Sequence, residues 1–305
     1  MARKKRSRRT GGAGPRKGEA GVRSGGTGTG SSGAGAGRTG DLAAGAGGGA
    51  GLDGFWAWGA PPLELDGLPT IVGPDPLLPS PTEAVMADIS AMVAGREFGS
   101  IEEANAFLRE ATTAGPLPSA LPATPLARAQ QLVYRAMDVG GKQRVALARK
   151  ALGFSKDCAD AHIILATETA RNQREEMELF QQALAAAERA LEGTGYEEHL
   201  PHLWGHVPGR PLLRALFGLG LAEWARGARL AAVEQLPRIL SLNEQDAQGV
   251  RYYLLGWLLD IDELVLAREL VGRYRENTAV WLWGDALLTF KEKGPSSGRA
   301  KLRKA

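Results

Sequence analysis

Glycine is concentrated at the start of this chain, and that limits how much of it can fold. Residues 1–52 hold 18 of the 41 glycines, together with ten Lys or Arg and only two acidic residues. Such a segment cannot bury enough apolar surface to offset the conformational entropy that ordering would cost. We therefore predict a disordered basic tail at 1–52, and one core built from about 200 of the remaining residues.

Charge and cysteine content exclude several classes of protein. Residues 1–52 carry a net charge of +8, residues 53–290 carry −10 and residues 291–305 carry +5. Cys158 is the only cysteine, which excludes an intramolecular disulfide and a cysteine-based zinc cluster. No apolar run approaches the roughly 18 residues of a spanning helix, and no apolar stretch follows the basic N-terminus as in a signal peptide. We expect a cytoplasmic protein without an integral membrane span.

Prolines and helix signals divide the rest of the chain. Clustered prolines prevent helices and central strands, whereas apolar residues three and four positions apart predict amphipathic helices. No segment shows the sustained alternation of a strand, so no sheet is expected. In chain order we predict a Pro/aromatic extended linker (53–81), a helical hairpin (82–115), a Pro-rich linker (116–125), a helical repeat domain (126–292) and a basic C-terminal tail (293–305).

The hairpin at 82–115 is predicted from its caps and its apolar spacing. Thr82 is expected to cap the first helix, whose apolar face would include Val85 and Met86. Ser100 is expected to cap the second helix, which runs toward Gly115.

The repeat domain shows a pattern of small and large residues at fixed spacing. The residues with this spacing match positions of a tetratricopeptide repeat. The small residues Gly220 and Ala232 would let two helices approach closely, Gly227 would end the first helix, and Leu219 and Leu236 match its large apolar positions, with Leu236 packing in the layer above. The predicted fold is all-α, a right-handed α-solenoid of tetratricopeptide-like helix hairpins. Its helix pairs are expected at 126–152, 158–193, 211–242 and 246–273, with a closing helix at 277–292.

Several short motifs of the repeat domain also occur together in one family. They are Leu203-Trp204-Gly205, Arg210-Pro211-Leu212-Leu213-Arg214, Asn243 to Asp246, Gln248-Gly249-Val250-Arg251-Tyr252 and Ala279-Val280-Trp281. In this combination residues 126–292 resemble tetratricopeptide-type proteins related to the suppressor of tumorigenicity seven family, including its soluble bacterial members. The resemblance implies an α-helical interaction scaffold without a known reaction.

Three arginines and one tryptophan are the predicted partner-binding residues. Arg210, Arg214 and Arg251 each lie near the start of the first helix of a pair. First helices of such repeats line the concave groove, so we expect these guanidiniums to anchor a peptide or protein partner. Trp204 lies in the Gly- and Pro-rich loop at 193–211, where it would pack the loop or cap the ligand.

An internal role is the alternative for the same arginines. Polar loops of solenoids need donors of their own, so the guanidiniums would then bind loop carbonyls or pair with Glu197, Glu198 or Asp246. Removing the charge would destabilise the fold in this case, and would mainly weaken partner binding in the other.

Other motifs give weaker signals for chemistry. His199, His202 and His206 would converge on a metal only if their loop were helical, and Pro201 and Gly205 argue against that. We therefore predict no metal, no cofactor and no catalytic residue. Cys158, without a nearby His or second Cys, is expected to be an inert thiol.

Aromatic residues and the basic end of the chain complete the predictions. Trp224, Trp257, Trp281, Trp283, Tyr252 and Tyr253 follow helical spacing and are expected to lie in the core. Residues 1–9 contain six cations and no aromatic, which predicts at most weak, nonspecific contact with nucleic acid.

Taken together, these features lead us to expect a non-enzymatic interaction scaffold. The alternative is a nucleic-acid- or polyanion-associated factor that acts through its basic arm.

Overall fold

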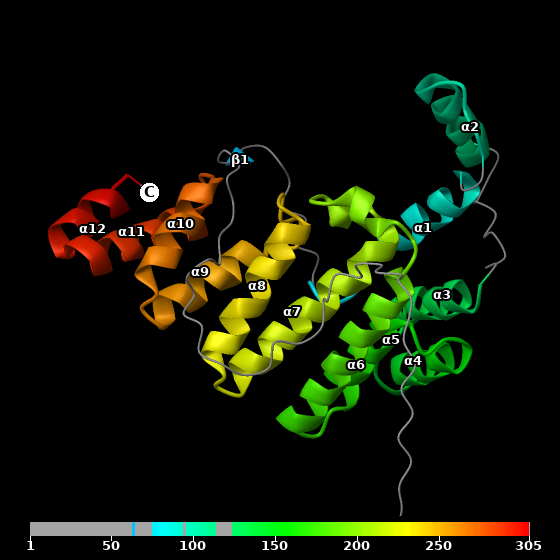
Figure 1. Cartoon of the computed structure of the whole chain (residues 1–305), viewed down its shortest axis with the longest axis horizontal. Helices are drawn as coiled ribbons and strands as arrows, with labels where there is room; N and C mark the ends of the chain where they lie inside the picture. The colour runs from blue at the N-terminus through cyan, green and yellow to red at the C-terminus, as the bar shows by residue number, and fades with distance from the viewer. Residues whose placement is uncertain (1–62, 65–74, 94–95, 114–123, 305) are drawn as a thin grey trace, which may run out of the picture. The chain divides into compact units, whose positions relative to one another are not determined.

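The computed structural model describes residues 63–64, 75–93, 96–113 and 124–304. The tail predicted at 1–52, most of the linker at 53–81 and most of the linker at 116–125 lie outside these residues. Nearly all of the described chain is helical (Figure 1). The α-helices are α1 (Pro81–Val93), α2 (Ile101–Thr113), α3 (Pro125–Met137), α4 (Gly141–Phe154), α5 (Ala159–Thr169), α6 (Gln173–Leu191), α7 (Arg210–Ala225), α8 (Arg229–Leu242), α9 (Val250–Asp260), α10 (Leu264–Arg273), α11 (Ala279–Lys293) and α12 (Pro295–Leu302).

The predicted all-α class is confirmed for the described residues, with one small exception. Strands β1 (Leu63–Glu64) and β2 (Tyr274–Arg275) pair in parallel, with Leu63 opposite Tyr274 and Glu64 opposite Arg275. The expectation of no strand is wrong here because a piece of the extended linker bonds through its backbone to the segment before α11. None of the described helices is long and apolar enough to cross a membrane.

The helices from α3 onward pack in the order of the chain. Each helix of this series packs against the next, and α3 with α5, α5 with α7 and α9 with α11 are also in contact (Figure 1). The helices predicted in pairs correspond to α3 and α4, α5 and α6, α7 and α8, and α9 and α10. Amphipathic hairpins bury their apolar faces in this way, on neighbouring hairpins.

Close packing inside the α7–α8 pair explains its small residues. A Cβ atom on Gly220 would lie 2.7 Å from Leu236 Cδ1, so only glycine allows the two helices to approach this closely. Gly227, at the turn between them, has φ of +85°, which disfavours other residues. Both features were expected from the spacing of the repeat. Helix α8 continues through the buried Pro237.

Two apolar clusters form the core. The larger draws on α5 to α11 and is centred on α7, where Leu213, Leu216 and Phe217 are fully buried. The smaller joins α3, α4 and α5; half of its residues are alanine, and its larger side chains include Leu132, Val133 and Ile164. The helices from α3 to α11 therefore pack as successive layers, whereas α2 contributes no residue to either cluster.

The ends of α1 and α2 and the C-terminal tail can each be compared with the prediction. Helix α1 begins at Pro81, so Thr82 lies inside the first turn instead of capping it. Ser100 caps α2 as expected, since its Oγ accepts a hydrogen bond from the Glu103 amide at 3.2 Å. The predicted tail at 293–305 includes helix α12, which packs on α11 where Gly298 lies against Phe290.

Candidate functional site

The loop at 193–211 folds as three 3₁₀ turns, η1 (Tyr196–His199), η2 (Leu203–Gly205) and η3 (Val207–Gly209). Leu203 is fully buried, and a Cβ on Gly209 would collide with it at 2.4 Å. Trp204 follows this anchor and remains partly exposed. The loop is therefore fixed by its apolar side chains and holds Trp204 at the surface.

Arg214 lies at the centre of a buried ion-pair network behind this loop. Its guanidinium donates to both oxygens of Glu83, from Nη1 and Nη2 at 2.9 Å each. It also donates from Nε to Asp160 Oδ1 at 2.8 Å and from Nη2 to Asp160 Oδ2 at 2.7 Å. One arginine of α7 thus binds α1 and α5 through two bidentate pairs, the strongest geometry available to a guanidinium.

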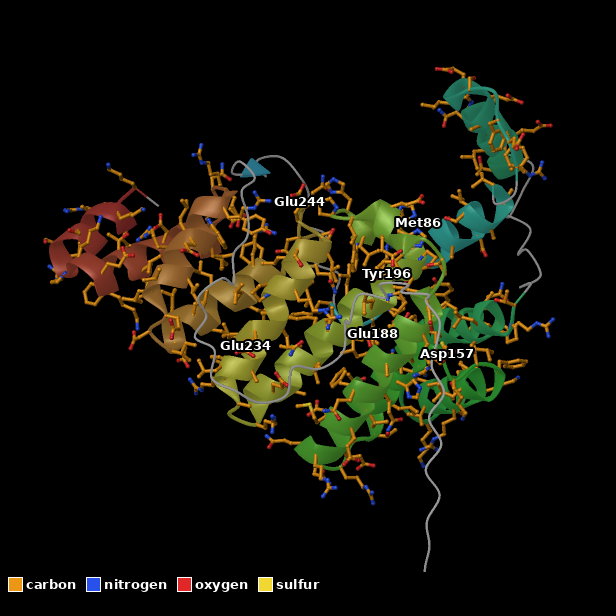
Figure 2. All side chains as sticks on the ribbon, in the orientation of Figure 1. Met86, Asp157, Glu188, Tyr196, Glu234 and Glu244 are labelled. Carbon is orange, nitrogen blue, oxygen red and sulfur yellow. The ribbon has the colours of Figure 1, made fainter. Side chains whose placement is uncertain are left out.

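Arg210, one turn before Arg214, connects the same network to the loop. Its Nε donates to the Trp204 carbonyl at 2.8 Å, and its Cζ lies 5.1 Å from the centre of the Trp204 ring. Nη1 is 3.4 Å from Glu83 Oε2, and Nη2 is 3.5 Å from the sulfur of Met86, labelled in Figure 2. We call Glu83, Asp160, Arg210 and Arg214 the Arg214 cluster.

The Arg214 cluster is balanced in charge. Two carboxylates face two guanidiniums, and all four side chains are buried. Burial alone would lower the pKa of Arg214, but Asp160 and Glu83 raise it above its ordinary range. Burial, followed by the charges of Glu83 and Asp160, also raises the pKa of the neighbouring Tyr134. Each carboxylate of the cluster is therefore engaged by at least one guanidinium.

Two members of the Arg214 cluster, Glu83 and Arg210, line a pocket of about 340 Å³. The segment that leads into α1 and the first turns of α1 form one wall, η2 and the start of α7 the second, and the turn between α8 and α9 the third. Glu83, Met86, Trp204 and Arg210 line it together with Asp75, Pro76, Leu78, Ser80, Thr82, His202, Gly205, Asn243, Gln245, Ala247 and Gln248. We call this the Trp204 pocket.

Two buried amides of the Trp204 pocket have unused hydrogen-bonding atoms. Asn243 and Gln248 are each only 2% exposed. Neither Asn243 Nδ2 nor Gln248 Oε1 has a hydrogen-bond partner in the protein. Sequence reasoning singled out neither residue for function, although both belong to the motifs on which the family resemblance rests. Both atoms are shielded from solvent, and other side chains of the described residues also have buried atoms without a partner, so these two atoms do not single out the pocket.

A second pocket, of about 450 Å³, lies between α1, α3, α6 and η3. Alanine and proline side chains form much of its wall, including Ala87, Ala187 and Pro208. Of its polar lining residues, Gln130 donates to Asp160 and Asp157 accepts from Arg189. The Trp204 pocket is the better candidate, because two of the predicted partner-binding residues, Trp204 and Arg210, line it.

Arg251 belongs to a separate network at the start of α9. It binds Asp246 from Nη1 at 2.9 Å and Glu276 from Nε at 3.0 Å, and its Nη2 lies 2.8 Å from the Tyr252 hydroxyl. Asp246 also accepts hydrogen bonds from the amides of Val250 and Arg251, at 2.8 and 2.9 Å. We call Asp246, Arg251, Tyr252 and Glu276 the Arg251 cluster.

The structure divides the four predicted site residues into two groups. Trp204 and Arg210 line the Trp204 pocket, as a partner-binding role requires. Arg214 and Arg251 are buried and engaged by carboxylates, and their contact with a partner stays a prediction. The internal alternative describes them better: Arg251 pairs with Asp246 as considered, whereas Arg214 pairs with Glu83 and Asp160 instead of Glu197 or Glu198.

The three loop histidines do not converge. The rings of His199 and His206 stack with centroids 4.0 Å apart, whereas His202 faces Glu244, 3.9 Å from its Oε1. Burial lowers the pKa of His206, and His199 lowers it further. No group of three side chains that could hold a metal ion occurs in the part of the chain that the structure describes.

The remaining expectations concern Cys158, the aromatic residues and the basic arm. Cys158 is fully buried, and burial raises the pKa of its thiol to about 12, as expected for an unreactive cysteine. Trp257 and Trp281 lie in the core, and Trp224 and Tyr252 pack against it; Tyr253 and Trp283 are exposed instead. The predicted nucleic-acid contact of residues 1–9 falls outside the described residues.

No protein-family model, curated protein or solved structure matches this chain. The functional argument therefore rests on the geometry of the site.

Proposed function

We propose that this protein is a non-enzymatic interaction scaffold of tetratricopeptide-like helix hairpins, which binds a peptide or protein partner in the Trp204 pocket. The packing of each helix on the next supports a solenoid, and the resemblance to the suppressor of tumorigenicity seven family fits the same interpretation. The observation that carries the proposal is the partly exposed ring of Trp204, which lies beside Arg210 in the wall of a pocket formed by three segments remote in sequence.

The chemistry of the pocket favours binding over catalysis. Glu83 and Asp160, the buried carboxylates in and behind the pocket, are both held by Arg214. Arg210 is engaged by the Trp204 carbonyl and by Glu83. The pocket offers the aromatic surface of Trp204 and the apolar side chains of Leu78 and Met86, which suit recognition of a peptide.

Site-specific photocrosslinking in cells tests the proposal. A photoreactive amino acid replaces His202, which is exposed at the rim of the pocket, or Arg174, which is exposed on α6. We expect a partner to crosslink from position 202 and not from position 174.

Binding of the purified partner then locates the interaction. We expect Trp204→Ala to weaken binding at least about tenfold, because a buried aromatic contact is a common binding hot spot. Arg174→Ala serves as the control and should have no effect. A partner that binds the wild-type chain and a folded Trp204→Ala variant equally well contradicts the proposal.

A further inference from the structure

Helix α11 exposes a continuous apolar face. Val280, Trp283, Leu287 and Phe290 are between 47 and 61% exposed. They follow one another at intervals of three, four and three residues, and this spacing places all four on one side of an α-helix. We call these four residues the Trp283 stripe.

No helix of the described chain covers the Trp283 stripe. Helix α11 packs against α9, α10 and α12 (Figure 1), and it buries Trp281 and Leu288 in the core on the side opposite the stripe. Its carboxylates, on Asp285 and Glu292, also lie on that opposite side and are both engaged by Arg268. A surface helix normally turns polar residues outward, so this uncharged apolar face indicates an interaction surface.

The area of the stripe suits an interface between two folded proteins. Since a large aromatic side chain accounts for about 150–250 Å², the four residues together leave on the order of 400 Å² in solvent. A standard interface buries about 800 Å² of each partner, and a little more than half of that area is apolar. The stripe therefore supplies most of the apolar surface that a stable dimer needs.

The spacing of the stripe makes it complementary to a second copy of itself. Apolar residues that alternate three and four positions apart are the pattern by which two helices pack side by side. If two copies of α11 pack antiparallel about a twofold axis near residue 285, Val280 of each copy faces Phe290 of the other, and Trp283 faces Leu287. Each contact then joins a larger side chain to a smaller one and occurs twice, as in an isologous interface.

Charge favours the antiparallel arrangement over the parallel one. The exposed cations Lys293, Arg299 and Arg303 lie at the C-terminal end of α11 and on α12 and just after it. A parallel pair would bring these cations of both copies together at one end. In the antiparallel pair the two copies of residue 293 are roughly 24 Å apart along the helix axis, at 1.5 Å per residue. That separation is well beyond the Debye length of about 8 Å at physiological salt.

We propose that this protein forms a twofold-symmetric dimer through the Trp283 stripe, with α11 of the two copies packed antiparallel. The equivalent face of a second copy then buries the apolar face that the described helices leave open. Because such an interface closes on itself, it produces a dimer and no larger assembly. None of the residues that line the Trp204 pocket belongs to α11, so the inference does not depend on the proposed function.

Sedimentation equilibrium of the full chain tests the inference. Measured from about 1 to 100 μM, the chain should show a monomer–dimer equilibrium with a Kd in the micromolar range or tighter. Trp283→Glu should raise the Kd at least about thirtyfold, because interface tryptophans are common hot spots and the substitution places a charge in each half of an apolar interface. Circular dichroism checks that the variant is folded.

A second exposed residue provides the matched control. Leu230 on α8 is 58% exposed, so Leu230→Glu adds the same charge at an exposed apolar residue outside the stripe and should leave the Kd unchanged. A monomer at every concentration would overturn the inference, and so would an assembly larger than a dimer. A dimer whose Kd is the same in wild type and in a folded Trp283→Glu variant would overturn it as well.

Cysteine crosslinking tests the orientation of the two helices. Cys158 is fully buried and leaves the added thiols as the reactive ones. With a short bis-maleimide, a mixture of Val280→Cys and Phe290→Cys chains should crosslink efficiently. Val280→Cys alone should not, because the two copies of residue 280 lie roughly 15 Å apart along the axis of an antiparallel pair. Equal crosslinking of Val280→Cys alone and of the mixture would overturn the antiparallel arrangement.

Discussion

The Arg214 cluster and the Arg251 cluster use the same chemistry over very different distances in the chain. Arg251 binds Asp246, five residues before it, and Glu276, 25 residues after it. Arg214 binds Asp160, 54 residues away, and Glu83, 131 residues away. The Arg251 cluster therefore stabilises one turn and its neighbouring helix, whereas the Arg214 cluster joins three helices that are remote in sequence.

The two clusters also contribute differently to the Trp204 pocket. Asp246 caps the start of α9 with two backbone hydrogen bonds and would do so without Arg251. The carboxylate oxygens of Glu83, by contrast, are bound by arginine side chains. Glu83 is also the only fully buried residue of α1. Helix α1 is thus held mainly by an ion pair, and this helix forms one wall of the Trp204 pocket.

The largest effect is expected from Arg214→Leu. The substitution leaves Asp160 without its arginine and Glu83 with only the longer contact to Arg210. Removing one partner of a buried ion pair typically costs about 3–5 kcal/mol in the free energy of unfolding. Urea unfolding followed by far-UV circular dichroism measures it. If the free energy of unfolding fell by less than about 1 kcal/mol, the ion pairs of Arg214 would only compensate for the cost of removing their charges from water.

Arg251→Leu should cost less, about 2 kcal/mol. Asp246 keeps its hydrogen bonds to the amides of Val250 and Arg251, and Glu276 keeps the Tyr252 hydroxyl at 2.7 Å. The same unfolding experiment ranks the two variants. An equal or larger loss for Arg251→Leu would remove the distinction between the two clusters.

A pH series tests a further buried group, His162 on α5, which belongs to neither cluster. Burial lowers the pKa of His162, and the charges of Lys156 and Arg189 lower it further, although the Lys156 carbonyl and Asp157 act in the opposite direction. The unfolded chain therefore binds a proton more readily than the folded one, so this contribution to stability is present above pH 6.5 and is lost as pH falls below it. The slope reaches at most about 1.4 kcal/mol per pH unit.

Comparison with His162→Gln isolates that contribution. Between pH 7.5 and 5.5 the wild-type free energy of unfolding should fall more steeply than that of the variant. Parallel curves would show that His162 titrates normally.

The smallest effect is expected at an exposed ion pair. Arg229 pairs with Asp260, and both side chains are about half exposed. Exposed pairs contribute about 0–1 kcal/mol, so Arg229→Gln should change the free energy of unfolding by less than that. A loss as large as that of Arg214→Leu would contradict the view that burial makes the Arg214 cluster important.

The same contrast explains how far the sequence alone could predict this protein. Helical periodicity and the spacing of Gly220, Gly227 and Leu236 depend on neighbouring residues, and they predicted the helices from α3 to α11. The pairing of Arg251 with Asp246 was among the alternatives for the same reason. Local patterns cannot reveal a partner 131 residues away, so Glu83 was not recognised.

Helix α1 is the clearest failure of local reasoning. Its apolar residues predicted a buried face containing Val85 and Met86, yet both are more than 40% exposed and the acidic Glu83 is buried. Arg210 and Arg214 attract that carboxylate into the interior, which overrides the hydrophobic pattern of a short helix. The Trp204 pocket was missed for the same reason, because three segments remote in sequence form it.

Hydrogen exchange of α1 tests most directly whether the Arg214 cluster holds this wall of the pocket. Amide exchange of residues 85–93 is measured by mass spectrometry in the wild-type chain and in Glu83→Gln, with α9 and α10 as internal references. We predict protected amides in the wild type, exchange at least about tenfold faster in α1 of the variant, and unchanged exchange in α9 and α10. Identical exchange of α1 in the two proteins would show that its apolar contacts hold the helix, and would contradict the account.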